Sequence, residues 1–246
     1  MRLTRLHVAA PLASGSLIDL PPEAAVHLAR VLRARGGDAL VLFNGDGREF
    51  AAVVDSVRGA RVAVAVGEER PTDRESPLAL TLLQCIPRGD RMDWIVQKAT
   101  ELGVQRIVPL VSRHVVVKLS ARQAQSKAAH WRAVAVNACE QCGRTRLPAI
   151  DTPRPLDEFL GAAPAGGARL LLDPDSDDAT SLDAAPAAIE CAVGPEGGFA
   201  PEEIECLRIA GFRALRLGPR ILRTETAALA ALVSLQLRCG DLRRPS

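Results

Sequence analysis

The chain has 246 residues, of which 48% are apolar, and a formal net charge of +2. This length allows one large domain or a small and a medium one, and the apolar content excludes a disordered chain. The small net charge excludes the strong basic excess of a histone-like nucleic-acid binder.

Residues 1–70 read as short strands with one brief helix. Apolar side chains alternate or run together over strand lengths, and the turn signals "NGDG" and "RGA" separate them. The expected strands are "RLHVA" (5–9), "ALVLFN" (39–44), "EFAAVVDSV" (49–57) and "RVAVAV" (61–66), with a helix over 22–33. We expect a small β-barrel or a curled sheet here.

The polar, proline-bounded segment 71–77 is typical of a linker, and from residue 78 strands alternate with helices. This rhythm predicts an α/β domain with a parallel sheet and with ligand loops at the carboxyl ends of the strands. The expected strands span 78–86, 106–112, 169–173, 190–195 and 214–219. The expected helices span 90–103, 120–142 (capped by Ser120), 201–211 and 225–238.

Two of these strands end in similar turns, "VGPEGGF" (193–199) and "LGPRILRT" (217–224). Glycine there lets peptide groups approach a ligand closely, although a tight turn without a ligand is the alternative. The first turn lacks the glycine pattern of a dinucleotide fold and the Gly-Lys-Ser/Thr of a P-loop. With Ile221 and Leu222 as apolar walls, the two turns suit a flat, mostly neutral heterocycle such as adenine.

The helix that follows is apolar on nearly all sides, which predicts burial all round, partly in a subunit interface. Thr224 is the expected N-cap of this helix. Glu225 either favours the positive end of the helix or orients Arg223.

The six cysteines lack disulfide-scaffold spacing, and no apolar run reaches membrane-spanning length, so we expect a cytoplasmic, reduced protein. The pair in "CEQC" (139–142) has no second ligand pair nearby. We therefore expect Cys139 and Cys142 to be packing residues and expect no metal.

The motifs "GPEGGF", "LGPRILRTETA", "RMDWIVQKATELGV" and "ACEQCGR", in this order, resemble the RsmE family. The likeness extends to "MRLTRLHV" and "HLARVLR", and so covers nearly the whole chain. Members of this family are SPOUT-class methyltransferases that use S-adenosylmethionine to methylate N3 of one uridine in 16S ribosomal RNA.

The resemblance implies a PUA-like β-barrel RNA-binding domain (1–70), a linker (71–77) and a SPOUT domain (78–246). The SPOUT domain is a parallel α/β sheet whose carboxyl-terminal segment forms a deep trefoil knot, and it works as a homodimer. The implied partner is 16S ribosomal RNA, within the assembled small subunit, without a membrane or a metal.

Carried over to this sequence, the resemblance places S-adenosylmethionine among three loops. The cofactor-binding residues are Leu172, Asp173, Gly194, Pro195, Glu196, Gly197, Gly198, Leu217, Gly218, Ile221, Leu222, Arg223 and Thr224. In this sequence Ala200 replaces a common helix-capping Ser or Thr, which predicts a weaker cap.

For catalysis, Arg223 is expected to stabilise the developing uracil anion, and Glu196 and Glu101 are the candidates for the general base. Arginines in both domains can grip phosphates, although scattered arginines are usually solvated. The RNA-binding candidates are Arg2, Arg5, Arg30, Arg33, Arg88, Arg91 and Lys98, with Arg144, Glu140 and Gln141 added from the family pattern.

Two other functions remain open from the sequence. A non-catalytic RNA-binding module would bind no S-adenosylmethionine. An enzyme acting on nucleotide phosphates, with "GPEGG" as its anion loop, would bind ATP with magnesium.

Overall fold

The computed structural model describes residues 3–115, 119–161, 166–176 and 186–242. The chain divides into two compact units. The first comprises Met1–Glu75 and Cys139–Leu147, and the second comprises Ser76–Ala138 and Pro148–Ser246. The division near residue 75 lies within the expected linker. The return of Cys139–Leu147 to the first unit has no counterpart in the expected boundaries, because long-range pairing and not local pattern produces it.

The first unit is a five-stranded sheet in the order β1-β3-β4-β5-β2. Its strands are β1 (Thr4–His7), β2 (Leu17–Asp19), β3 (Ala39–Phe43), β4 (Glu49–Arg58) and β5 (Arg61–Arg70). Strands β1 and β3 run parallel, whereas the other neighbouring pairs are antiparallel. Alternate side chains of β4 and β5 are buried, as a sheet with one covered face requires. Strand β2 was missed by the sequence analysis because three residues carry no detectable alternation.

The expected helix over 22–33 is shorter and irregular. Helix α1 (Pro22–Val26) passes into a π-helical turn, η1 (His27–Val31), in which the Leu32 N–H donates to the His27 carbonyl. Arg33 then adopts a φ of 53°, which ends the helical path.

The second unit contains a seven-stranded sheet in the order β12-β10-β11-β6-β7-β8, with β9 also paired to β7. All of these pairs are parallel. The strands are β6 (Ala79–Cys85), β7 (Arg106–Val111), β8 (Ala149–Ile150), β9 (Arg154–Pro155), β10 (Ala168–Leu172), β11 (Ala188–Val193) and β12 (Arg213–Leu215). The sequence analysis predicted all but the two-residue strands β8 and β9.

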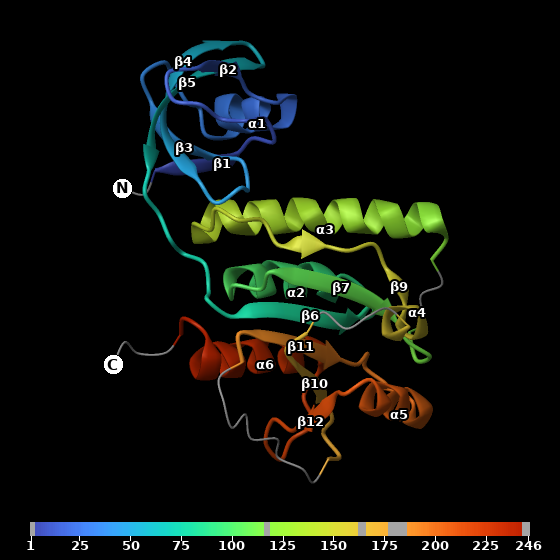
Figure 1. Cartoon of the computed structure of the whole chain (residues 1–246). Helices are drawn as coiled ribbons and strands as arrows, with labels where there is room; N and C mark the ends of the chain where they lie inside the picture. The colour runs from blue at the N-terminus through green and yellow to red at the C-terminus, as the bar shows by residue number, and fades with distance from the viewer. Residues whose placement is uncertain (1–2, 116–118, 162–165, 177–185, 243–246) are drawn as a thin grey trace. The chain divides into compact units, whose positions relative to one another are not determined.

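Helices cover both faces of this sheet (Figure 1). They are α2 (Arg91–Glu101), α3 (Ala121–Cys142), α4 (Leu156–Leu160), α5 (Pro201–Ile209) and α6 (Thr224–Cys239). One core cluster joins the sheet to α2, α3 and α6, and a second joins it to α4 and α5. Leu82 belongs to the first cluster and Leu83 to the second, as the alternation of a strand buried on both faces demands. The predicted α/β domain with a parallel sheet is thus confirmed.

The starts of three helices test the expected caps. Ser120 caps α3 as predicted: its Oγ accepts from the Gln123 N–H, and the Gln123 side chain accepts from the Ser120 N–H. At α5 the cap residue Ala200 offers no side-chain acceptor, but the Glu203 carboxylate accepts its N–H. The prediction that Thr224 is the N-cap of α6 was wrong. The cap position is Arg223, and the Thr224 hydroxyl donates elsewhere.

Helix α6 buries Ala228, Ala231, Leu232 and Leu235 against α2 and the sheet. In the described part of the chain, no helix combines the length and the apolar character needed to cross a bilayer.

Candidate functional site

The carboxyl ends of β10, β11 and β12 open into a cavity of about 400 Å³. Because these neighbouring strands are parallel, the loops that follow them meet at one edge of the sheet. The cavity is lined by the loop after β10, by the turn Gly194–Phe199 after β11, and by the segment Leu217–Arg223 before α6.

All thirteen residues expected to bind the cofactor line this cavity. They are Leu172, Asp173, Gly194, Pro195, Glu196, Gly197, Gly198, Leu217, Gly218, Ile221, Leu222, Arg223 and Thr224. The sequence analysis did not single out other lining residues, among them Pro174, Asp175, Phe199 and Arg220. These residues directly follow the predicted cofactor-binding residues in sequence or lie between them. Treating each loop as one continuous binding segment would have included them.

The turn after β11 is closed tightly. A Cβ on Gly194 would lie 3.2 Å from both the Phe199 nitrogen and its ring, and Gly198 has a φ of 70°. A larger residue at either position would therefore push the turn out of shape. The Thr224 hydroxyl donates to the Gly194 carbonyl at 2.6 Å, which joins this turn to the start of α6.

Asp173 follows β10 and is buried, with 8% of the residue exposed. Its Oδ1 accepts from the Asp175 N–H at 3.1 Å, so the carboxylate orders a turn that lines the cavity.

Glu196 lines the cavity, but its carboxylate is already engaged. It accepts from the Arg88 N–H at 3.0 Å and pairs with the Arg91 guanidinium. Burial by itself raises the pKa of the Glu196 carboxyl, but these hydrogen bonds and the positive charge of Arg91 together lower it. A lowered pKa makes Glu196 a weaker base than an ordinary glutamate.

Arg223 is exposed at the mouth of the cavity, and within the described residues its side chain makes no hydrogen bond or ion pair. The suggestion that Glu225 orients Arg223 was wrong: Glu225 lies 3.6 Å from the Arg91 guanidinium instead.

Glu101 lies away from the cavity, and this contradicts its place among the base candidates. It ends α2, which runs back from the carboxyl edge of the sheet, and so lies toward the amino ends of the strands. Its carboxylate pairs with Lys98 at 2.8 Å. Lys98 is therefore also distant from the cavity.

His114 was missed by the sequence analysis, which offers no signal for it. Its Nδ1 lies 3.2 Å and 3.1 Å from the carbonyl oxygens of Gly197 and Gly198. Since both neighbours are acceptors, Nδ1 carries the proton and supports the turn from outside.

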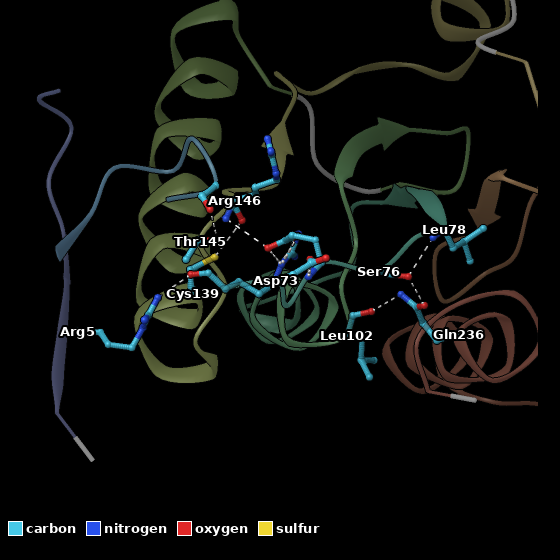
Figure 2. Close-up of polar contacts among 12 residues, drawn as sticks. Arg5, Asp73, Ser76, Leu78, Leu102, Cys139, Thr145, Arg146 and Gln236 are labelled. Carbon is cyan, nitrogen blue, oxygen red and sulfur yellow. Dashed lines mark hydrogen bonds and ion pairs between the residues drawn. The ribbon is translucent and has the colours of Figure 1, made fainter. Parts of the chain in front are cut away.

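Two arginines expected to bind RNA are structural in the first unit. Arg5 is buried and pairs with the buried carboxylate of Glu49, and it also donates to the Arg144 carbonyl at 3.1 Å. Arg144 is 4% exposed and pairs with Glu75 at 2.6 Å. Figure 2 shows Arg5 directed at the segment that includes Thr145. A phosphate cannot reach either guanidinium, so these two predictions were wrong.

Replacing Arg5 by Ala is expected to lower the free energy of unfolding of the first unit by about 3–5 kcal/mol, because it leaves the buried Glu49 carboxylate with only the half-exposed Arg74. Urea denaturation followed by circular dichroism measures the loss. A loss below about 1 kcal/mol, the range of surface pairs, would contradict a structural role.

Glu140 is also structural, since its carboxylate accepts the His7 N–H at 2.9 Å. Among the other candidates, Arg30 and Arg33 are exposed beside the π-helical turn, and Arg88 is exposed beside the cavity. Arg91 is tied to Glu196 and Glu225. Arg2 lies outside the described residues.

Replacing Arg30 by Ala is expected to leave folding unchanged, weaken RNA binding and reduce the salt slope by about one, as loss of one phosphate contact does. Filter binding to small-subunit RNA over a salt series tests this. An unchanged slope would remove Arg30 from the RNA surface.

Four of the six cysteine side chains are buried. Cys139 is buried and Cys142 half-buried at the end of α3, and a hydrogen bond from Cys142 raises the pKa of the Cys139 thiol. Burial likewise raises the pKa of Cys85 and Cys191 to about 12. Among the residues that the structure describes, no group of three or more His, Cys, Asp or Glu is arranged to hold a metal ion.

Sequence comparison finds two family matches. Residues 74–236 match the family described as RNA methyltransferase domain, and residues 20–60 match RNA methyltransferase PUA domain. Ribosomal RNA small subunit methyltransferase E of Buchnera aphidicola (strain Sg) is 30% identical over 98% of both chains. The protein of the same name from Bacillus subtilis is 30% identical over 88% of both chains.

Solved structures give the same result. A methyltransferase from Legionella pneumophila with bound SAM superposes with a TM-score of 0.94 at 40% identity, covering 98% of this chain and 100% of that one. Ribosomal RNA small subunit methyltransferase E from Neisseria gonorrhoeae, bound to S-adenosyl methionine, has a TM-score of 0.91 at 36% identity with the same coverage.

Proposed function

The chain belongs to the family of ribosomal RNA small subunit methyltransferase E, and from that premise we propose that it methylates N3 of one uridine in 16S ribosomal RNA. It is a ribosomal RNA methyltransferase and takes its methyl group from S-adenosylmethionine. The exact target base is the proposed step, and the assembled small subunit in the cytoplasm is the proposed setting.

The cavity at the carboxyl edge of the second sheet is the observation that carries this proposal. Its volume lies in the range of small-molecule sites. Leu172, Leu217 and Leu222 give apolar walls suited to an adenine ring, and the turn Gly194–Phe199 lines the same cavity, where its peptide groups can offer hydrogen bonds. Asp173 supplies a negative charge suited to a cationic donor. The residues present therefore fit S-adenosylmethionine, which when bound supplies an electrophilic methyl group.

The reaction requires that N3 of uracil lose its proton before it attacks. Arg223 is an exposed cation at the mouth of the cavity, and we propose that it stabilises the negative charge that develops on the uracil. Glu196 is the remaining carboxylate candidate for proton removal, and its engagement with Arg88 and Arg91 means that a bound substrate must loosen these contacts first. The sulfonium donor needs no metal for this step.

Two further properties belong to the proposal. We infer that the carboxyl-terminal segment is threaded as a deep trefoil knot, a rarity among folds. The support is that Leu217–Arg223 shares one cavity with the loops after both β10 and β11, and that Thr224 is bonded to Gly194.

We infer also that the protein is a homodimer. The outer face of α6 forms an apolar hollow with Trp94 of α2, which is 44% exposed. Leu237, on α6 itself, is 52% exposed there. The hollow is lined by Trp94, Thr226, Leu229, Ala230, Val233, Ser234, Leu237 and Arg238. A second copy of the same face is the natural cover for a helix this apolar.

Mass spectrometry of ribosomal RNA tests the target. A strain that lacks the protein is expected to lose N3-methyluridine from its 16S RNA, and restoring the wild-type chain is expected to return it. Persistence of that base in the deleted strain would refute the target. Calorimetry distinguishes the alternative functions. Heat of binding on adding S-adenosylmethionine excludes a protein that only binds RNA. The absence of heat on adding ATP with magnesium excludes an enzyme that acts on nucleotide phosphates.

A further inference from the structure

A buried glutamine links the centre of the second sheet to two of the loops that form the cavity. Gln84, on β6, is 0% exposed. Its Nε2 donates to the Thr224 hydroxyl at 3.0 Å and to the Cys85 carbonyl at 2.9 Å. The Thr224 hydroxyl in turn donates to the Gly194 carbonyl at 2.6 Å. The central strand, the start of α6 and the turn after β11 are thus joined in one chain of hydrogen bonds.

We propose that Gln84 is a positioning residue for S-adenosylmethionine: it sets the relative placement of the Gly194 turn and the Thr224 helix start without lining the cavity itself. The proposal rests on the proposed function, because it assumes that this cavity holds the methyl donor. Gln84 itself does not line the cavity, whereas Thr224, to which it donates directly, and Gly194, which it reaches through Thr224, both do.

The chemistry of the amide explains the choice of residue. A planar amide has two N–H groups, and both are used, one on a hydroxyl and one on a carbonyl. The direction of these hydrogen bonds is fixed as well. The Thr224 hydroxyl donates its single proton to the Gly194 carbonyl and must therefore accept from Gln84. A carboxylate, a hydroxyl or an apolar side chain cannot make this pair of donations.

The buried amide of Gln84 also has an unfavourable feature for the stability of the fold. Its Oε1 is buried and has no hydrogen-bond partner among the described residues. A buried acceptor left without a partner is unfavourable, and an apolar side chain at this place would avoid it. An amide at this position is explained if its hydrogen bonds fix the geometry of the cavity.

A second buried glutamine provides a matched control. Gln236, on α6, is also 0% exposed. Its Oε1 accepts from the Ser76 hydroxyl at 2.7 Å and its Nε2 donates to the Leu102 carbonyl at 2.8 Å, as Figure 2 shows. These partners lie at the amino edge of the sheet, away from the cavity. Gln84 and Gln236 therefore match in chemistry and burial, and differ in what they hold.

The test compares Gln84→Met, Gln236→Met, Thr224→Val and the double variant Gln84→Met/Thr224→Val. Calorimetry gives the Kd for S-adenosylmethionine, thermal unfolding gives Tm, and methylation kinetics give the KM for RNA. Gln84→Met is expected to raise the Kd roughly five- to tenfold, the effect of losing one hydrogen bond, with the KM for RNA unchanged. The double variant is expected to bind S-adenosylmethionine as tightly as the single variant with the higher Kd, because both substitutions break the same series of hydrogen bonds.

Gln236→Met is expected to keep the Kd for S-adenosylmethionine within about twofold of the wild-type value. Its Tm is expected to fall at least as far as that of Gln84→Met, because it loses comparable buried hydrogen bonds. A wild-type Kd in folded Gln84→Met would overturn the proposal, and so would Kd changes in both methionine variants that follow their losses of Tm. If Gln84→Met does not fold, Gln84→Asn, which keeps the amide but shortens its reach, answers the same question. These readouts of donor binding need no RNA, so a wrong target base would leave them intact.

Discussion

Replacing Arg223 by Ala is expected to slow methyl transfer by roughly 100-fold or more while the Kd for S-adenosylmethionine changes only a few-fold. The guanidinium is exposed at the cavity mouth, where it can meet a substrate. Arginine stays protonated at any working pH, so its charge is present when the uracil becomes negative. Transfer of labelled methyl groups to small subunits, with calorimetry for the donor, separates the two effects.

Two variants sharpen this test. Arg223→Lys keeps the charge but loses the planar fork, so it is expected to recover part of the rate. Arg213→Ala removes another exposed arginine, at the amino end of β12 and so opposite the cavity, and is expected to leave the rate unchanged. Equal loss of rate and of donor affinity in Arg223→Ala would instead assign Arg223 to the donor pocket alone.

The sequence predicted the placement of the cavity well because its signals are local. A parallel sheet brings the carboxyl ends of its strands to one edge, and "VGPEGGF" and "LGPRILRT" mark two of these ends by glycine and proline. Their approach in space follows from the strand order, with β10 between β11 and β12. Knowing the class of fold therefore places the loops together, without knowledge of any side-chain contact.

Side-chain roles that depend on distant partners could not be predicted in this way. Arg5 reads as a surface cation, yet Glu49 and the carbonyl of Arg144 bury it. Glu101 reads as a free carboxylate, yet the direction of α2 carries it to the wrong edge. Gln84 lies within an apolar run and gives no sign that Thr224 will lie 3.0 Å away. Each of these outcomes joins residues more than forty positions apart or depends on the path of a whole element.

The outer face of α6 depends both on local sequence composition and on contacts between distant residues. Its composition predicts burial on all sides, and the structure covers only the side toward α2 and the sheet. Val233 lies half-buried in the apolar hollow left on the other side. If the proposed homodimer forms there, twofold symmetry brings Val233 of each copy into the same interface.

Replacing Val233 by Glu is therefore expected to dissociate the dimer. In the monomer the new carboxylate reaches water, so the fold survives, whereas the dimer must bury two unpaired charges at a cost of several kcal/mol each. The dimer dissociation constant is expected to rise roughly 1000-fold or more, which sedimentation equilibrium measures. Ile209→Glu, an equal change at a 78% exposed position on α5, is expected to remain dimeric. A Val233→Glu protein that still sediments as the wild-type dimer would move the interface to another surface.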